Sequence, residues 1–308
     1  MSHLPKQRTL ARPATVAGIG FFTNADVTAT FLPAEPDSGI LFVRADLPDR
    51  PEIPATIAHA VERHRRTALE KNGASVELTE HLLAALAGLE IDNCIVELDG
   101  PEPPGGDGSA RHFVDALLAA EIVEQDQFAA VFGVTSRLVV ELPGGAGSVR
   151  AEPVAAPLAG RLHRKRAAGP GAPTASQCVL RYELDCGPGS PIPPQSAELA
   201  LTPEAFATEI AGARTFILES EIEALRSRGY GKKVTLGDLL VFGQAGVIGN
   251  ALRADNECAR HKLLDCIGDF ALVGGRLAGR FTATRTGHAA NRELVRRMAT
   301  DGRARNAA

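Results

Sequence analysis

The sequence predicts an α+β protein of two similar halves, each a β-sheet packed on helices. Apolar residues alternate along residues 27–32, and a second candidate strand, residues 39–47, follows a Pro-Asp-Ser-Gly turn. An internal echo links the halves, because HLLAALAG from His81 and HKLLDCIG from His261 each lead to a glycine seven residues on. In both places an apolar helix leads towards a strand. Leu- and Ala-rich helices resemble one another easily, so the echo supports the two halves without establishing them.

The rest of the first half reads as helix, strand and helix. Thr79 is a good N-cap for a helix whose leucines continue to residue 89, and IDNCIVEL (91–98) is a strand candidate. A loop rich in Gly and Pro follows, and residues 110–122 return to a helical pattern. The polar stretch VEQDQF precedes the next strand. We therefore predict an N-terminal α+β domain over residues 1–125 and a C-terminal α+β domain over residues 126–308.

The second half offers a longer series of elements. Strands are expected at TSRLVVEL, VLRYELD and AELALT, and a helix over residues 203 to about 228. A further helix is expected over residues 256–270, followed by a strand over residues 279–284. Residues 155–176 are rich in Ala, Gly, Pro and Arg. Their basic cluster fits a solvated surface loop better than a phosphate-binding patch, so we predict a loop.

Composition excludes several classes of function. The chain has 308 residues and a net charge of −4, which gives no electrostatic reason to expect a nucleic-acid partner. No apolar run approaches the ~18 residues of a membrane span, and the N-terminus lacks a signal-peptide pattern. The five cysteines form no CxxC pair, which is typical of free thiols in a reducing compartment. We expect a cytoplasmic monomer with no integral membrane segment.

The segment RHKLLDCIGD carries the first set of reactive side chains. His261 and Asp265 are four residues apart, so they lie on one helix face about one turn apart, and Asp269 follows one turn later. Such a face can hold a metal or form part of a catalytic site. A solvated face with an i,i+4 ion pair explains the spacing equally well, and spacing alone does not separate the two.

Two further segments add ionisable groups. Glu80 and His81 are adjacent in the first turn of an apolar helix, where neighbouring side chains diverge by about 100°. One can therefore bind a metal while the other faces a substrate, although a glutamate there also suits the helix dipole. His288 follows a strand and a glycine in TRTGHAANREL, where a lone histidine is usually a surface or capping residue.

Together the three segments contain the parts of a catalytic metal site. Two histidines and one carboxylate leave the fourth position of a tetrahedral Zn²⁺ open for water, and the same set suits Fe²⁺. A free glutamate beside that water can act as a general base, and a free histidine as a general acid. The sequence contains no HExxH, dinucleotide-binding, Walker A or GxSxG motif.

Four blocks then follow one another in a characteristic order. They are TEHLLAALAGLEIDNCIVELDGPEPPGGDGSA, ARTFILESEIEALRSRG, RHKLLDCIGD and FTATRTGHAANREL. Over nearly its whole length the chain resembles the UDP-3-O-acyl-N-acetylglucosamine deacetylases of lipid A biosynthesis. The resemblance implies zinc-dependent hydrolysis of the N-acetyl group of a nucleotide-linked acylated amino sugar, with release of acetate. It also implies an active site between two α+β halves.

The resemblance implies a role for each reactive side chain. The zinc ligands would be His81, His261 and Asp265, and Glu80 would accept the proton of the zinc-bound water. His288 would be cationic, stabilise the developing charge and protonate the amine leaving group.

Four more roles follow from the same resemblance. Asp269 would orient His288 and favour its imidazolium form. Thr215 would hydrogen-bond the carbonyl oxygen as it becomes an oxyanion. Lys262 would face the diphosphate of the nucleotide, and Phe216 would lie near the sugar or nucleobase.

The resemblance also places an acyl-chain passage in residues 230–250. That stretch retains several apolar residues, which ordinary core packing would explain as well: Val234, Leu236, Leu239, Leu240, Val241 and Phe242.

The chain departs from the family pattern where substrate recognition is expected. Phe22 stands where the family usually has histidine, Asn24 replaces a glycine, and Lys232-Lys233 replaces a glycine pair. These changes motivate a second hypothesis, a metal-dependent deacetylase of another N-acylated amino sugar. A third hypothesis is a non-catalytic nucleotide-sugar-binding protein, and the complete catalytic set argues against it.

Overall fold

Strand β9 (Cys94–Leu98) occupies the centre of the main sheet in the first half of the chain. The computed structural model describes residues 5–154, 177–300 and 304–306, so the loop expected at residues 155–176 lies outside the described residues. The sheet has the order β2–β3–β9–β4–β5, with β3 antiparallel and β4 parallel to β9. The remaining strands of this sheet are β2 (Ala14–Ile19), β3 (Asp26–Pro33), β4 (Ile40–Arg44) and β5 (Glu52–Pro54).

The inner face of this sheet packs on two helices, α1 (Glu80–Gly88) and α2 (Arg111–Ala119). The alternation expected along residues 27–32 is present in β3, whose side chains at Val27, Ala29 and Phe31 are buried. Phe31 meets Phe113 of α2 edge to face, at 6.0 Å between ring centroids. The three strands and two helices expected in this half are therefore present; β3 is slightly longer than expected, and the other four elements are shorter.

Strand β19 (Arg276–Thr284) has the corresponding place in the second half. β13 pairs antiparallel and β14 parallel with β19, which gives the order β12–β13–β19–β14–β15. Helix α5 (Glu257–Ala271) precedes β19 and helix α6 (His288–Thr300) follows it. The other strands of this sheet are β11 (Val131–Val134), β12 (Leu138–Glu141), β13 (Ser148–Glu152), β14 (Cys178–Leu184), β15 (Gln195–Ala200) and β20 (Ala304–Asn306).

The two halves repeat one strand arrangement. β2–β3–β9–β4–β5 and β12–β13–β19–β14–β15 share the same order and the same parallel and antiparallel pairings. In each half one helix, α1 or α5, lies between the fifth strand and the central one along the chain. This agrees with the echo between HLLAALAG and HKLLDCIG. The chain is α+β, as predicted, and the division at residue 125 stays a prediction.

Each half carries an insert before its central helix. The first is the three-stranded sheet β6–β7–β8, preceded by a short 3-10 turn, Ile57–His59. Its strands are β6 (Ala60–Val61), β7 (Ala68–Lys71) and β8 (Ala74–Val76). The second is the three-stranded sheet β16–β17–β18 with helix α4. Its elements are β16 (Phe216–Leu218), α4 (Ile222–Ser227), β17 (Leu240–Gly243) and β18 (Gly246–Val247).

The continuous helix expected over residues 203–228 is wrong. Short helical turns, α3 (Pro203–Ala205) and Phe206–Ile210, are followed by the strand β16, and only then by α4. Parallel pairing with β17 holds β16 extended, with Phe216 opposite Leu240. Tertiary pairing thus overrides the helical pattern of this stretch.

The polar stretch VEQDQF forms part of a strand. It belongs to β10 (Ile122–Phe128), which pairs antiparallel with β1 (Lys6–Leu10). The domain boundary predicted near residue 126 therefore falls within a paired strand. Thr79 stands at the expected N-cap of α1, but its hydroxyl donates to the Thr67 carbonyl oxygen at 3.3 Å instead of capping the helix.

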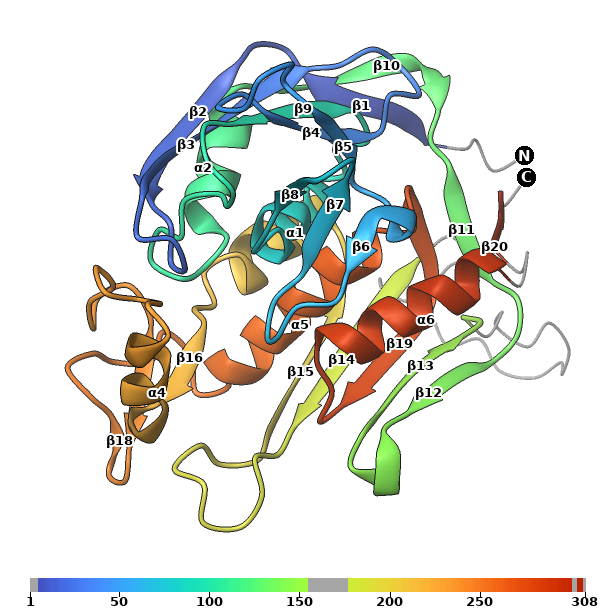
Figure 1. The fold of residues 1–308 in the computed structure, drawn as a ribbon. Coiled ribbons are helices and arrows are strands. Elements are labelled where there is room, and N and C mark those ends of the chain that lie inside the picture. Colours follow the sequence, from blue (N-terminus) through green and yellow to red (C-terminus); the bar gives the residue numbers. More distant parts are fainter. Residues whose placement is uncertain (1–4, 155–176, 301–303, 307–308) are drawn as a thin grey trace, which may run out of the picture.

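Helices α1 and α5 pack against each other between the two sheets (Figure 1). Gly268 of α5 makes this approach possible, because a Cβ added there would lie 2.0 Å from the carbonyl oxygen of Glu80. The close approach sets the first turn of α1 beside the middle of α5. Within the described part of the chain, no helix combines the length and the apolar character needed to cross a membrane.

We expect Gly268→Ala to lower the free energy of unfolding by about 1–3 kcal/mol, because the new methyl group overpacks the α1–α5 contact. Helix propensity alone would favour alanine by about 1 kcal/mol, so the sign of the change separates the two effects. Urea denaturation followed by circular dichroism measures it.

Gly133→Ala is the matched control, because a Cβ at Gly133 meets nothing within 4 Å. We expect the control to change stability by less than about 0.5 kcal/mol. A Gly268→Ala protein as stable as wild type would contradict the packing argument.

Candidate metal centre and active site

Three candidate metal ligands converge where α1 meets α5. His81 comes from the first turn of α1, and His261 and Asp265 lie one turn apart on α5. The Nε2 atoms of both histidines lie 3.5 Å from Asp265 Oδ1, and one ligand atom from each residue fits within 4.8 Å of the others. The structure therefore brings together residues from both halves that are 180 positions apart in the chain.

The protonation of these groups suits a divalent cation. His261 Nδ1 lies 3.1 Å from the Ala213 carbonyl oxygen, so Nδ1 carries the proton and Nε2 keeps its lone pair. Burial lowers the pKa of His261 to about 4, which keeps the ring neutral. Burial would raise the pKa of Asp265, but Lys262 and His261 hold it well below the usual range. A neutral imidazole and an ionised carboxylate are what Zn²⁺ or Fe²⁺ requires.

Glu80 lies beside this group with one oxygen held and the other directed at His288. The Thr67 backbone N–H donates to Glu80 Oε2 at 3.0 Å, and Glu80 Oε1 lies 3.8 Å from His288 Nε2. The Glu80 side chain is 3% exposed. Burial raises the pKa of Glu80, against the opposing charges of His288 and His81. The first turn of α1 thus directs His81 to the candidate metal ligand Asp265 and the Glu80 carboxylate to His288.

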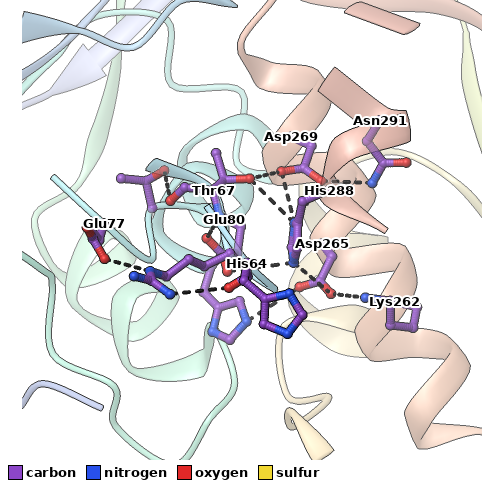
Figure 2. A network of polar contacts seen from close by, with 12 residues as sticks. His64, Thr67, Glu77, Glu80, Lys262, Asp265, Asp269, His288 and Asn291 are labelled. Carbon is purple, nitrogen blue, oxygen red and sulfur yellow. Dashed lines mark hydrogen bonds and ion pairs between the residues drawn. The ribbon is translucent and has the colours of Figure 1, made fainter. Parts of the chain in front are cut away.

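His288 stands opposite Glu80 at the start of α6 and is oriented from behind by Asp269 (Figure 2). Its Nδ1 lies 3.0 Å from Asp269 Oδ2, and Asn291 donates to the same oxygen at 2.8 Å. Burial alone would lower the pKa of His288, but the carboxylates of Asp269 and Glu80 raise it to about 9. His288 is therefore an imidazolium at neutral pH, with its Nε2 proton facing the candidate metal site.

The remaining predicted residues line the same cavity. Thr215 directly precedes β16 of the second insert, and its backbone N–H donates to the Gly108 carbonyl oxygen at 2.8 Å. Phe216 lies edge to face against the His261 ring, with 6.2 Å between centroids. Lys262 lines the cavity while its ammonium donates to Asp265 Oδ2 at 2.7 Å. Burial disfavours its charge, but Asp265 outweighs burial and raises the Lys262 pKa.

The cavity has a volume of about 970 Å³ and joins the polar centre to an apolar wall. The wall comes from the second insert: Ile217, Ile222, Leu225, Val234, Leu236, Leu239 and Val241. Four of the six apolar residues expected in a passage thus line the cavity. Leu240 and Phe242 do not, because they belong to the hydrophobic core cluster.

Phe22, one of the departures from the family pattern, lines this cavity. The Phe22 ring stacks at a tilt on Tyr230, with 4.6 Å between centroids, and the Arg66 guanidinium lies 4.3 Å from the Phe22 ring. Asn24 adopts a φ of 59°, which asparagine tolerates better than most residues, so it can replace a glycine. Its amide donates to the Gly229 carbonyl oxygen at 2.9 Å.

The sequence missed several residues that contact the candidate catalytic groups or Phe22. Asn291 lies three residues after His288 on α6, and that spacing could have placed both on one helix face. No sequence spacing could have predicted Tyr230 and Arg66, because both contact the Phe22 ring from distant segments of the chain. Thr67 contacts Glu80 and Asp269 from the loop before β7, and no spacing in the sequence relates these three residues.

The profile of one protein family matches residues 7–300, described as UDP-3-O-acyl N-acetylglycosamine deacetylase. The chain belongs to this family. A deacetylase of this name from Myxococcus xanthus is 36% identical over 96% of this chain and 87% of its own length. A second, from Xanthomonas oryzae pv. oryzae, is 33% identical over 97% of this chain and 91% of its own length. Both are curated as UDP-3-O-acyl-N-acetylglucosamine deacetylases.

A bifunctional family member extends the comparison. The bifunctional enzyme LpxC/FabZ of Chlorobaculum tepidum is 36% identical over 95% of this chain. The chain spans 64% of the length of that relative. The region of that relative that matches this chain is therefore one part of a longer polypeptide.

We expect Asp269→Asn to lower the pKa of His288 from about 9, because the neutral amide removes the nearest opposing charge. A charge at this distance shifts a pKa by about 1–3 units. NMR titration of the ring protons in metal-free protein, assigned with His288→Gln, measures the shift. Asp126→Asn changes an exposed carboxylate and should leave the His288 titration unchanged. An unaltered titration in Asp269→Asn would contradict this account of the pair.

Proposed function

We propose that this protein hydrolyses the N-acetyl group of UDP-3-O-acyl-N-acetylglucosamine in lipid A biosynthesis and releases acetate. The observation that carries the proposal is the pairing of a buried carboxylate, Glu80, with an imidazolium, His288, beside the His81–His261–Asp265 group. Membership of the deacetylase family supports the substrate. The apolar cavity wall beside the polar centre supports an acylated sugar in particular.

In this proposal Zn²⁺ is the cofactor, and His81, His261 and Asp265 would hold it. The ion would polarise the acetamide carbonyl and make a nearby water more acidic at neutral pH. The ligand set also accepts Fe²⁺, so the native metal is part of what a metal analysis must establish. Because Nδ1 of His261 is engaged by the Ala213 carbonyl, the ring is already oriented for ligation through Nε2.

Glu80 acts as the general base. Its Oε2 is fixed by the Thr67 N–H, which leaves Oε1 to accept the proton of the attacking water. Burial raises the pKa of Glu80 and so makes the carboxylate a stronger base than an exposed glutamate. The water oxygen forms a bond to the acetamide carbon, and the proton moves to Glu80.

His288 acts as the general acid. Its Nε2 proton passes to the amine nitrogen as the C–N bond breaks, which yields acetate and a free amino sugar. Asp269 holds the ring through Nδ1, so that Nε2 is the nitrogen that donates. The Thr215 hydroxyl would hydrogen-bond the carbonyl oxygen as it gains negative charge.

The substrate would lie along the cavity with its acyl chain on the apolar wall. Lys262, whose charge is retained beside Asp265, would face the diphosphate, and Phe216 would lie against the sugar or nucleobase. Both assignments are consistent with their place in the cavity lining. We further propose that the protein acts as a cytoplasmic monomer, a location consistent with its free cysteines.

A second candidate is a deacetylase of another N-acylated amino sugar. The Phe22–Tyr230 ring pair in the cavity lining favours it, because Phe22 presents an apolar ring where a polar histidine is expected to contact substrate. Equal turnover of the nucleotide sugar with and without its 3-O-acyl chain would favour this candidate. A metal-free protein that stays inactive with added Zn²⁺ would instead support a non-catalytic sugar-binding role.

Glu80→Gln should reduce kcat for acetate release by about 10²–10⁴-fold, because the amide cannot accept the water proton. Metal content should stay at the wild-type level, whereas His81→Ala should lose its bound metal. Acetate release and elemental analysis of the purified proteins measure the two effects. Glu223→Gln, which alters an exposed glutamate of α4, is the matched control. Undiminished activity in Glu80→Gln would remove Glu80 as the base.

Leu225→Arg should raise KM for the 3-O-acylated substrate, because it puts a charge in the apolar wall. Each CH₂ group kept from burial costs about 0.8 kcal/mol, so losing two would raise KM roughly tenfold. The substrate without its acyl chain should show an unchanged KM. Ala224→Arg places the same charge one residue away on the exposed side of α4 and serves as the control. Equal effects on both substrates would exclude Leu225 from acyl-chain binding.

A further inference from the structure

Thr67 touches both of the carboxylates on which the proposed chemistry depends. It is fully buried in the loop before β7. Its backbone N–H donates to Glu80 Oε2 at 3.0 Å, and its hydroxyl donates to Asp269 Oδ1. Glu80 belongs to the first half of the chain and Asp269 to the second, so a single residue from the first insert joins the two (Figure 2).

The direction of the hydroxyl bond is fixed by its surroundings. The Arg292 guanidinium lies 3.3 Å from Thr67 Oγ1 and can only donate. His288 Nδ1 lies 3.4 Å from the same oxygen. Arg292 is 1% exposed, so its guanidinium is held in the protein interior beside the Thr67 hydroxyl. The hydroxyl oxygen is therefore an acceptor on the Arg292 side, and its one proton is directed to Asp269.

This bond completes the set of contacts that holds Asp269 in place. Asp269 Oδ1 accepts from Thr67, while Oδ2 accepts from Asn291 at 2.8 Å and faces His288 Nδ1 at 3.0 Å. With both oxygens held, the carboxylate cannot rotate about its terminal bond without losing a hydrogen bond. The plane of the carboxylate in turn sets the tilt of the His288 ring and the direction of Nε2.

We propose that Thr67 is a positioning residue that fixes the Glu80 base and the Asp269–His288 pair relative to each other and to the reacting acetamide. The inference rests on the proposed deacetylase function. It assigns a role to a threonine outside the metal ligands and outside the groups that exchange protons. Thr67 acts through Asp269 by its hydroxyl and on Glu80 by its backbone, so only the first action is removed by a side-chain change.

Thr67→Val removes the hydroxyl and keeps the shape of the side chain, whereas Thr67→Ser keeps the hydroxyl. We expect Thr67→Val to lower kcat for acetate release on the order of tenfold, the effect of losing an orienting partner of an active-site group. KM and bound metal should stay at wild-type values, and Thr67→Ser should restore kcat to within about twofold. Thr67→Ala, which places no methyl group beside Asp269, gives the same comparison if Thr67→Val does not fold.

Thr9→Val is the matched control for the loss of a buried threonine hydroxyl. Thr9 Oγ1 accepts from the Ala34 N–H at 3.0 Å, remote from the candidate metal ligands. The control should lower the melting temperature while leaving kcat unchanged. A kcat loss in Thr9→Val equal to that in Thr67→Val would reduce the effect to general destabilisation and overturn the proposal.

A double-mutant cycle with Asp269→Asn tests whether Thr67 acts through Asp269. Once Asp269 is neutral, the hydroxyl has no carboxylate to orient, so adding Thr67→Val should change kcat less than twofold. If the two substitutions lowered kcat independently, so that the double variant lost the product of the two single losses, the proposal would be overturned. Wild-type protein loaded with Zn²⁺ that released no acetate from the nucleotide sugar would instead refute the proposed function. An active wild type with an equally active Thr67→Val variant would refute the inference alone.

Discussion

The approach of α1 to α5 is the constraint on which the candidate site depends. Glycine at position 268 lets the backbone of Glu80 come within a distance that any side chain would prevent. The same approach sets His81 opposite His261 with ring centroids 4.9 Å apart and brings Asp265 between them. Each half supplies one helix, and neither helix alone carries all three candidate metal ligands. The repeated strand order of the two sheets gives these helices equivalent positions, so the site forms on the pseudo-symmetric contact between them.

Around this contact, burial and charge assign different tasks to chemically similar groups. The carboxylate of Asp265 stays ionised beside Lys262, whereas burial makes the Glu80 carboxylate more basic. The imidazole of His261 is kept neutral by burial, whereas His288 is kept protonated by carboxylates. When two side chains of the same type have different surroundings, their pKa values differ. One can then serve as an acid or base while the other serves as a metal ligand. The inserts then enclose these groups and add the apolar wall of the cavity.

Local patterns in the sequence predicted the parts of the fold and site that depend on neighbouring residues. The i,i+4 spacing placed His261 and Asp265 on one face, and alternation identified β3. The prediction of His81 as a ligand depended mainly on family resemblance, because no local spacing in the sequence relates it to the residues of α5. The helix expected over residues 203–228 failed because pairing with β17, a distant strand, decides the conformation of β16. Thr67 was not predicted for the same reason, since its partners come from α1, α5 and α6.

The division of the proposed ligands between two helices also has a thermodynamic consequence. An ion held by His81 on α1 and by His261 on α5 would act as a reversible cross-link between the halves of the molecule. Because the separated or unfolded chain lacks the paired arrangement, occupancy would stabilise the docked state by RT ln(1 + [M]/Kd). Metal supply would then set the lifetime of the polypeptide as well as its activity. Protein made during metal shortage would unfold more often than metal-bound protein. It would therefore be degraded faster by proteases.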